Sequence, residues 1–148
     1  MGQPLRLAGR VDRSPAPRPE PIISDEELAR LTNVNLLIMG ADDVVARFVT
    51  SLWPSFSAPS VVRRRDEPLR LAPASQQAGT ILVYDVHALT RLEQHALSRW
   101  ISAGNGRTRV VSTTTQSLLP LLETGAFNDG LYYRLNVVTL DLTSRVAQ

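Results

Sequence analysis

Apolar residues gather in five short runs along the 148-residue chain, separated by polar segments of helical periodicity. Most of these runs are apolar without alternation, which is typical of strands covered on both faces. The pattern predicts strands at 35–39, 60–63, 80–85, 108–113 and 136–142. Because the runs alternate with helical segments, we expect an α/β fold with a mostly parallel five-stranded sheet.

Two capping boxes mark predicted helix starts. Glu27 follows Ser24 by three residues, and Glu93 follows Thr90 by the same spacing, so each pair can satisfy two backbone N–H groups reciprocally. The second helix is expected to end near Gly104, where "GNG" occurs. Its apolar stripe is predicted to consist of Leu92, Ala96, Leu97, Trp100 and Ile101.

A third helix is expected directly after the first strand. Asp42 or Asp43 is predicted to cap its N-terminus, and Pro54 to stop it. Two shorter helices are expected, one around Pro120 and one at the end of the stretch 128–135. The buried face of the third helix is predicted to be Val44, Val45, Phe48, Val49 and Leu52.

The composition fits one globular domain, since apolar residues make up 43% of the chain. We expect a disordered Pro- and Arg-rich arm at 1–21, an α/β domain at 22–143 and a short tail at 144–148. No apolar run approaches the roughly 20 residues of a membrane span, and we expect no membrane contact. Cysteine is absent, which excludes disulfides and thiolate metal sites. With no apolar signal segment at its N-terminus, the protein is expected to be cytoplasmic.

All 16 basic residues are arginine, and the chain contains no lysine. The net charge is only +2. A protein without an amine side chain cannot use a lysine to hold phosphates, and it cannot form a Schiff base. The lysine-free composition therefore excludes two common chemistries.

Ligands of parallel α/β sheets bind at the carboxyl ends of the strands. In this chain those ends carry Gly40, Asp85 and the stretch 112–115. The two histidines, His87 and His95, are expected in a loop and on the polar side of a helix, without metal-ligand spacing. Chemistry, if present, is predicted at the carboxyl edge.

Three carboxylates near this edge suggest one alternative. Asp42, Asp43 and Asp85, with Thr113 or Thr114, could bind Mg²⁺ and accept a phosphoryl group at Asp85, as in the phospho-acceptor domains of two-component systems. Those domains also use a lysine, which this chain lacks. Acidic residues after a strand also occur for purely structural reasons, as helix caps.

A run of three arginines allows two interpretations. Arg63, Arg64 and Arg65 could contact nucleic acid. Asp66 and Glu67 follow at once, which favours a solvated turn that neutralises itself.

Four blocks in one order resemble the AAA+ domain of sigma-54-dependent transcription activators. "GAFNDGLYYRLNVVTLDL", at 125–142, resembles the arginine-finger region of that family. "NVNLLIMG" resembles its Walker A strand, "GTILVYDVHALTRLEQHALSRWI" its Walker B segment, and "TRVVSTTTQSL" its sensor I strand. The resemblance covers about residues 24–142. It implies the P-loop AAA+ fold, with three layers and a sheet of order 5-1-4-3-2.

The chain departs from the family pattern at the nucleotide site. Where members have "GESGTGKELVAR", this chain has "GADDVVAR": Gly40 remains, four residues including the lysine are missing, and Asp42 and Asp43 lie at the helix N-terminus. Asp85 matches the metal-associated aspartate, but Val86 replaces the catalytic glutamate. Valine cannot activate water.

Further departures lie elsewhere. Thr115 stands at the sensor I asparagine, and Asn128 replaces the first of two interface arginines. Arg134 matches the second. No "GAFTGA" sequence occurs between Arg47 and Ile81, and we expect no helical lid domain.

These observations together predict a pseudo-ATPase that keeps the AAA+ scaffold and works through protein contacts, in transcription regulation. We expect no cofactor unless the degenerate site still binds ATP and Mg²⁺. The partner could be an active AAA+ activator whose ATP site Arg134 enters, or further copies of the chain. Alternatively, Arg134 only pairs with a local carboxylate such as Asp129, or the domain is a scaffold unrelated to sigma-54.

Overall fold

The fold is built on a five-stranded sheet, whose strands are all parallel and have the order β2-β3-β4-β1-β5. The computed structural model describes residues 24–58, 60–73 and 79–144. The predicted order 5-1-4-3-2 is confirmed. The strands are β1 (Leu36–Met39), β2 (Ser60–Arg63), β3 (Gly79–Val83), β4 (Thr108–Thr114) and β5 (Val138–Asp141).

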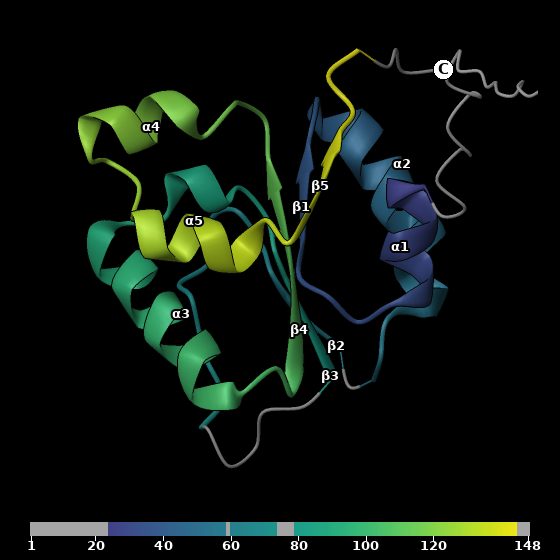
Figure 1. Cartoon of the computed structure of the whole chain (residues 1–148), viewed down its shortest axis with the longest axis horizontal. Coiled ribbons are helices and arrows are strands. Elements are labelled where there is room, and N and C mark those ends of the chain that lie inside the picture. The colour runs from purple at the N-terminus through teal and green to yellow at the C-terminus, as the bar shows by residue number, and fades with distance from the viewer. Residues whose placement is uncertain (1–23, 59, 74–78, 145–148) are drawn as a thin grey trace, which may run out of the picture.

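Helices cover both faces of the sheet and make three layers, as Figure 1 shows: α1 and α2 lie on one face, and α3, α4 and α5 on the other. The helices are α1 (Asp25–Leu31), α2 (Asp42–Leu52), α3 (Arg91–Gly104), α4 (Leu119–Thr124) and α5 (Asp129–Leu135), with 3-10 turns η2 (Trp53–Ser55) and η4 (Val86–Ala88). The expected arm at 1–21 and the residues after 144 lie outside the described part of the chain.

Two hydrophobic cores lie on the two faces of the sheet. Leu36 and Ile38 of β1 belong to the core under α1 and α2, whereas Leu37 belongs to the core under α3, α4 and α5. All three side chains are buried. A strand covered on both faces needs apolar side chains at every position, which explains the uninterrupted run in the sequence.

The capping boxes are both present. Ser24 Oγ accepts from Glu27 N at 3.1 Å while Glu27 Oε1 accepts from Ser24 N at 3.0 Å, and Thr90 and Glu93 repeat the arrangement. At the other end of α3, Asn105 adopts φ 51°, the left-handed conformation that ends helices. The predicted boundaries of α1 and α3 are therefore confirmed.

The predicted apolar stripe of α3 is wrong at Leu92 and Ala96, which are both exposed. Leu92 is 79% exposed, and the buried side chain at this end is Gln94. Gln94 Nε2 donates to the carbonyls of Leu89 and Ala126, and its Oε1 accepts from Asn128 N at 2.8 Å. A fully bonded glutamine costs little to bury, so α3 can turn this face inward.

Arg109 of β4 is a second buried polar residue, 1% exposed. Its Nε donates to Val34 O at 2.7 Å and its Nη2 to Ala29 O at 2.8 Å, and the guanidinium lies 5.7 Å from the centre of the Phe56 ring. Burial lowers the pKa of this side chain. Arg109 thus connects the end of α1 to the middle of the sheet.

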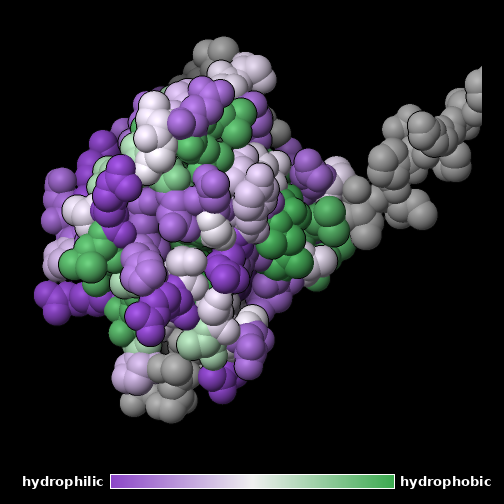
Figure 2. Space-filling view, turned by 60° about the vertical axis from the view of Figure 1, so that its left-hand side comes forward, coloured by the Kyte–Doolittle hydropathy of each residue, from purple (hydrophilic) through white to green (hydrophobic). Residues whose placement is uncertain are grey.

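The outer surface of α3, α4 and α5 is mixed. Figure 2 shows this side as mostly hydrophilic, with separate small hydrophobic patches. Exposed apolar residues on these helices are Leu92, Leu119 and Tyr133. Within the described residues, we find no helix with the length and apolar character needed to cross a bilayer.

The Glu93 carboxylate gives a pH dependence that can be tested. The hydrogen bond from Thr90 N chiefly holds its pKa below the ordinary value of 4.5, helped by Leu69 N at 3.2 Å. Its stabilisation is thus complete above about pH 4.5 and is lost as the pH falls through the lower pKa of the folded state. We expect Glu93→Gln to lower the free energy of unfolding at pH 7, and the difference from the unmodified chain to shrink on acidification. Urea titrations at several pH values measure this difference. A constant difference would contradict the prediction.

Candidate functional site

Three strand ends meet at the carboxyl edge of the sheet and position the candidate site. Gly40 follows β1 and donates from its N–H to Thr114 O of β4 at 3.0 Å. Asp85 follows β3, and its N–H donates to Thr113 Oγ1 at 3.0 Å. The predicted meeting of Gly40, Asp85 and the threonines of β4 is therefore present.

The turn from β1 to α2 is very short, because only Gly40 and Ala41 separate the strand from the helix. Ala41 is the N-cap, with no side-chain hydrogen bond, and its carbonyl accepts from Val45 N at 2.9 Å. The prediction that Asp42 or Asp43 caps α2 is wrong. Asp42 opens the first turn instead, and Asp43 Oδ1 accepts from the adjacent Val44 N. A longer loop would be needed to place an aspartate at the cap.

Gly40 is required by packing at this turn. A Cβ at Gly40 would lie 3.1 Å from Leu142 Cβ and 3.4 Å from Val45 Cγ2, and φ is not positive. The end of β5 approaches closely, since Leu142 N donates to Met39 O at 2.7 Å. The glycine therefore allows strand and helix to pack, independent of any phosphate.

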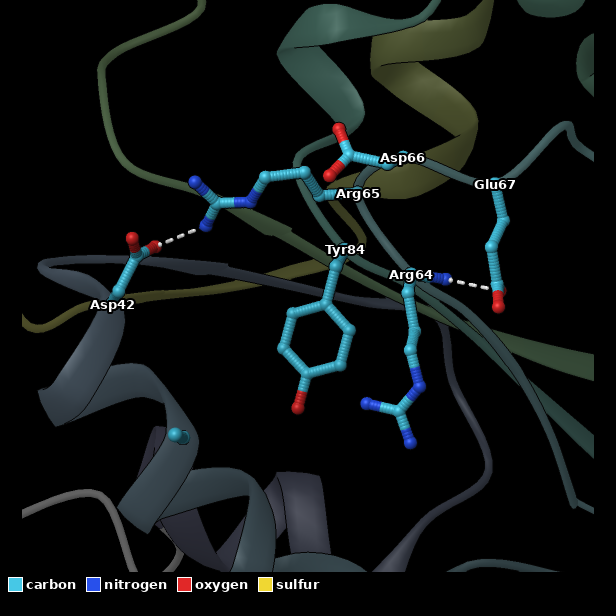
Figure 3. A pocket seen from close by; sticks show the side chains of 7 residues that line it. Asp42, Arg64, Arg65, Asp66, Glu67 and Tyr84 are labelled. Carbon is cyan, nitrogen blue, oxygen red and sulfur yellow. Dashed lines mark hydrogen bonds and ion pairs between the residues drawn. The ribbon is translucent and has the colours of Figure 1, made fainter.

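One arginine joins the two acidic positions of the site. Arg65, just beyond β2, places Nη2 2.9 Å from Asp42 Oδ1 and Nε 2.5 Å from Asp85 Oδ2. Figure 3 shows Arg65 reaching across to Asp42 at the start of α2. The hydrogen bond to Asp42 and the charge of Asp85 raise the pKa of Arg65. The Asp85 side chain is only 5% exposed, so Arg65 supplies the counter-charge that a buried carboxylate requires.

Asp85 and Val86 are consecutive, but the side chain of Asp85 lies at the carboxyl edge and that of Val86 lies in the core. Asp85 has φ 56°, a left-handed conformation that aspartate adopts more readily than most residues. Val86 is fully buried in the core beneath α3. Where the family has its catalytic glutamate, this chain therefore has a core residue. Thr115, the sensor position, is exposed.

His87 lies at the same edge, next to Asp85 as the sequence indicates, but its partial burial and its contact with Thr114 were not predicted. Its Nδ1 lies 3.0 Å from Thr114 Oγ1, and that hydroxyl donates to Gln116 O at 2.8 Å. The donor in the bond between His87 and Thr114 is set by the tautomer of the imidazole ring. His95 is exposed on α3, as expected.

The structure does not assemble the three carboxylates of the phospho-acceptor alternative. Asp42 and Asp85 come together only through Arg65, while Asp43 bonds to its own helix. Among residues 24–58, 60–73 and 79–144, no three acidic or histidine side chains are placed to share a metal ion.

The three consecutive arginines do not form one patch. Arg63 is buried, with Nε donating to Glu67 O and Nη1 to Tyr84 O, both at 2.9 Å. Arg65 is paired with Asp42 and Asp85, so the three charges do not lie together on one patch. The turn neutralises itself only in part, through Asp66 acting on Arg65 and Glu67 bonded to Arg64 N. Contact with nucleic acid stays a prediction. Arg64 is exposed, and its charge acts on the Tyr84 hydroxyl.

Arg134 lies exposed on α5. Its Nε donates to Ser98 Oγ of α3 at 3.2 Å, and among the described residues it makes no ion pair with Asp129. Asn128, at the first interface-arginine position, caps α5 through its Oδ1, which accepts from Leu131 N at 2.7 Å. The cap could have been found from the sequence, since asparagine is a favoured N-cap residue. The Arg65 pairs could not, since they join residues 23 and 20 positions apart.

A parallel sheet of this order, with a strand–glycine–helix turn beside an acidic strand end, defines the α/β subdomain of P-loop AAA+ proteins. The family model for the Sigma-54 interaction domain matches residues 24–144, so the chain belongs to this family. The helical lid of such proteins is not among the described residues.

Known relatives agree with this assignment. The HTH-type transcriptional regulatory protein TyrR of Salmonella typhimurium is 32% identical over a region that covers 43% of this chain and 15% of TyrR. NtrX from Brucella abortus, solved with ATP, has a TM-score of 0.60 and 20% identity, covering 80% of this chain and 35% of NtrX. The P-loop NTPase domain of the Sigma-54 transport activator from E. coli has a TM-score of 0.54 and 16% identity, covering 78% and 92%. At these identities the solved structures show a shared fold. The chain spans only a small part of TyrR and about a third of NtrX.

Replacing Gly40 by alanine tests the packing role of the turn. We expect Gly40→Ala to lower the free energy of unfolding by about 1–3 kcal/mol, because the new methyl group is forced against Leu142 and Val45. Thr115→Ala, at an exposed position of the same edge, should change it by less than about 0.5 kcal/mol. Urea denaturation measures both, and equal effects would refute the packing argument.

Replacing Arg65 tests its role as counter-charge. We expect Arg65→Ala to destabilise the chain, and to do so less in an Asp85→Asn background, where no buried charge needs balancing. Asp43→Asn is the control background, since Asp43 lies in the same turn without pairing to Arg65. The same loss in all three backgrounds would show that the pair contributes nothing.

Proposed function

We propose that this chain is a member of the Sigma-54 interaction domain family that neither binds nor hydrolyses ATP, and that it acts by protein contacts in transcription regulation. One observation carries the proposal: Arg65 bridges Asp42 and Asp85 at the carboxyl edge. The same two strand ends would have to receive a nucleotide and its metal ion.

Charge is the first argument. The Arg65 guanidinium already provides the positive charge next to Asp85, so a metal ion would have to displace a cation held by two carboxylates. Asp42 and Asp43 also place negative charge at the helix N-terminus, the end that binds phosphate in nucleotide sites. A triphosphate approaching this turn would meet repulsion.

Shape and chemistry are the second argument. A turn of two residues offers too few backbone N–H groups to surround phosphates, and the chain has no lysine to assist. Val86 cannot take a proton from water and faces the core. The short turn and the missing lysine affect nucleotide binding, whereas Val86 affects the activation of water. No single substitution is therefore expected to restore hydrolysis.

Calorimetry with Mg·ATP and with ADP tests this proposal. We expect no binding heat and no rise in the melting temperature at millimolar nucleotide, for the unmodified chain and for Arg65→Ala alike, because the lysine and the loop remain absent. An active domain of the family serves as positive control. Saturable nucleotide binding by the unmodified chain would overturn the proposal.

Arg134 supports action through a partner. Its guanidinium is exposed and contacts only the neutral hydroxyl of Ser98 among the described residues. An arginine in this state costs little to reposition, and it could enter the ATP site of an active neighbouring AAA+ subunit as an arginine finger does. The chain would then supply an arginine finger to a neighbouring subunit while having no functional ATP site of its own.

Mixing experiments test this contact. With an active sigma-54 activator as partner, we expect the ATPase rate to change on addition of the chain, and the change to disappear with Arg134→Ala. Arg91→Ala, which removes an exposed arginine from the start of α3, should behave as the unmodified chain. Equal effects of the unmodified and Arg134→Ala chains would exclude the finger. Light scattering on the chain alone would show whether it instead assembles with further copies.

A further inference from the structure

A pocket of about 350 Å³ lies beside α2, on the face of the sheet opposite α3, and the proposed function does not use it. Three parts of the chain line it: the end of α2 with the turn η2, strand β2 with the residue that follows, and strand β3 with the residue that follows. The described lining residues are Val49, Thr50, Trp53, Pro54, Val62, Arg64, Leu82 and Tyr84. We call it the Trp53 pocket. None of these residues belongs to the carboxyl-edge site around Asp42, Asp85 and Arg65.

The floor of the Trp53 pocket is a part of the sheet that α2 covers incompletely. Leu82 belongs to the core under α2, while Val62 and Tyr84 pack against that core and stay partly exposed. After β2 the chain passes to the other side of the sheet, where Leu69 and Leu71 pack into the core under α3. Of the described residues between β2 and β3, only one lines the pocket. The apolar floor is therefore accessible from solvent.

Trp53 forms an apolar wall that is already held in place. It directly follows α2 and is 42% exposed. Its ring lies tilted against the ring of Phe56, which is buried, with 5.5 Å between the ring centres. An aromatic side chain fixed by a buried neighbour needs little ordering when a ligand packs against it. The wall is thus suited to binding an apolar group.

The polar groups of the pocket lie together. Figure 3 shows the side chains of Arg64 and Tyr84 next to each other and extending in the same direction. Burial raises the pKa of the Tyr84 hydroxyl, and the charge of Arg64 acts against this effect, so the two groups are close enough to interact. The hydroxyl therefore stays protonated at neutral pH and can donate a hydrogen bond beside the guanidinium.

This pair of donors favours a ligand with a single negative charge. A guanidinium presents parallel N–H groups that match the two oxygens of a carboxylate. Arg64 is the only charged residue among the described lining residues. Asp66 and Glu67 lie on the turn that follows, and Glu67 Oε1 accepts from Arg64 N at 3.0 Å. Their charges would repel the second negative charge of a phosphate.

The rest of the lining restricts the body of the ligand. Val49, Val62 and Leu82 are apolar, as is Pro54, and no described lining residue is acidic. An ammonium group would therefore be buried here without a counter-charge. A volume of about 350 Å³ is at the small end of the range of ligand pockets, ~300–1,000 Å³. The pocket thus favours a small apolar acid that has no amino group.

We propose that the Trp53 pocket binds a small apolar carboxylic acid, whose carboxylate pairs with Arg64 and the Tyr84 hydroxyl and whose apolar body lies against Trp53. The proposal is independent of whether the carboxyl edge binds nucleotide, because the two sites share no residue.

Calorimetry on the full chain with three matched probes tests the ligand class. The probes are 3-phenylpropionate, its uncharged amide 3-phenylpropanamide, and phenylalanine, which adds an ammonium group to the same skeleton. We expect 3-phenylpropionate to bind saturably, and the other two at least about tenfold more weakly, because one lacks the charge and the other buries an unpaired cation. Equal affinity for the acid and the amide would overturn the proposal.

Substitutions in the pocket test the contacts. We expect Arg64→Gln to weaken binding of 3-phenylpropionate at least about tenfold and to abolish the preference for the acid over the amide. Trp53→Ala should weaken both probes, about tenfold, and leave the preference intact. Arg99→Gln, at an exposed arginine of α3, is the control and should change neither value. Melting temperatures show that each variant is folded. A preference that survives Arg64→Gln in a folded variant would exclude the carboxylate pair.

The two tryptophans allow the ligand to be located. Trp53 lines the pocket, whereas Trp100 lies on α3, where its Nε1 donates to Ala72 O at 2.6 Å. In nuclear magnetic resonance spectra, 3-phenylpropionate should shift the indole N–H signal of Trp53 and not that of Trp100. The Trp53→Ala variant assigns the two signals.

Three further outcomes would contradict the proposal. No saturable binding of 3-phenylpropionate at millimolar concentration would mean that the pocket is not a site for apolar acids. A shift of the Trp100 signal alone would place the ligand on the other face of the sheet. Tighter binding of the peptide acetyl-Ala-Ala-Phe than of 3-phenylpropionate would assign the pocket to the C-terminus of a peptide in place of a free acid.

Discussion

Helices cover both faces of the parallel sheet, so polar groups of the central strands reach solvent only where the strands end. This constraint determines the packing and the charge pairs at the carboxyl edge. Every side chain of β3 and β4 is buried. Strand ends can then approach so closely that Gly40 has no room for a methyl group beside Leu142. For the same reason Val86, one residue beyond Asp85, joins the core.

The charge at this edge is balanced within the chain. In an AAA+ protein that uses nucleotide, the strand-end aspartate and the helix N-terminus face ions that come from solution. Here Arg65 is covalently attached to β2, and a tethered group has a much higher effective concentration than a dissolved ion. Asp85 therefore does not depend on a ligand for its counter-charge. The framework of the family persists because the two cores need it, whether or not the edge binds anything.

Local rules were sufficient for most of the fold. Spacing alone predicted both capping boxes, since Ser24–Glu27 and Thr90–Glu93 act within one turn, and uninterrupted apolar runs located the strands because burial on both faces demands them. The strand order came from resemblance, and the topology agrees.

What the sequence by itself determined was therefore whatever depends on neighbours in the chain. Only the tertiary structure decided which charges meet: it buried Arg63 against backbone carbonyls, paired Arg65 across β3 and α2, and left Arg64 exposed, although the three are consecutive. It also exposed Leu92 and buried Gln94, because the carbonyls that satisfy the glutamine come from segments apart in sequence. Electrostatic pairing and hydrogen-bond satisfaction act across space, and the residue types alone do not specify which partners lie within reach.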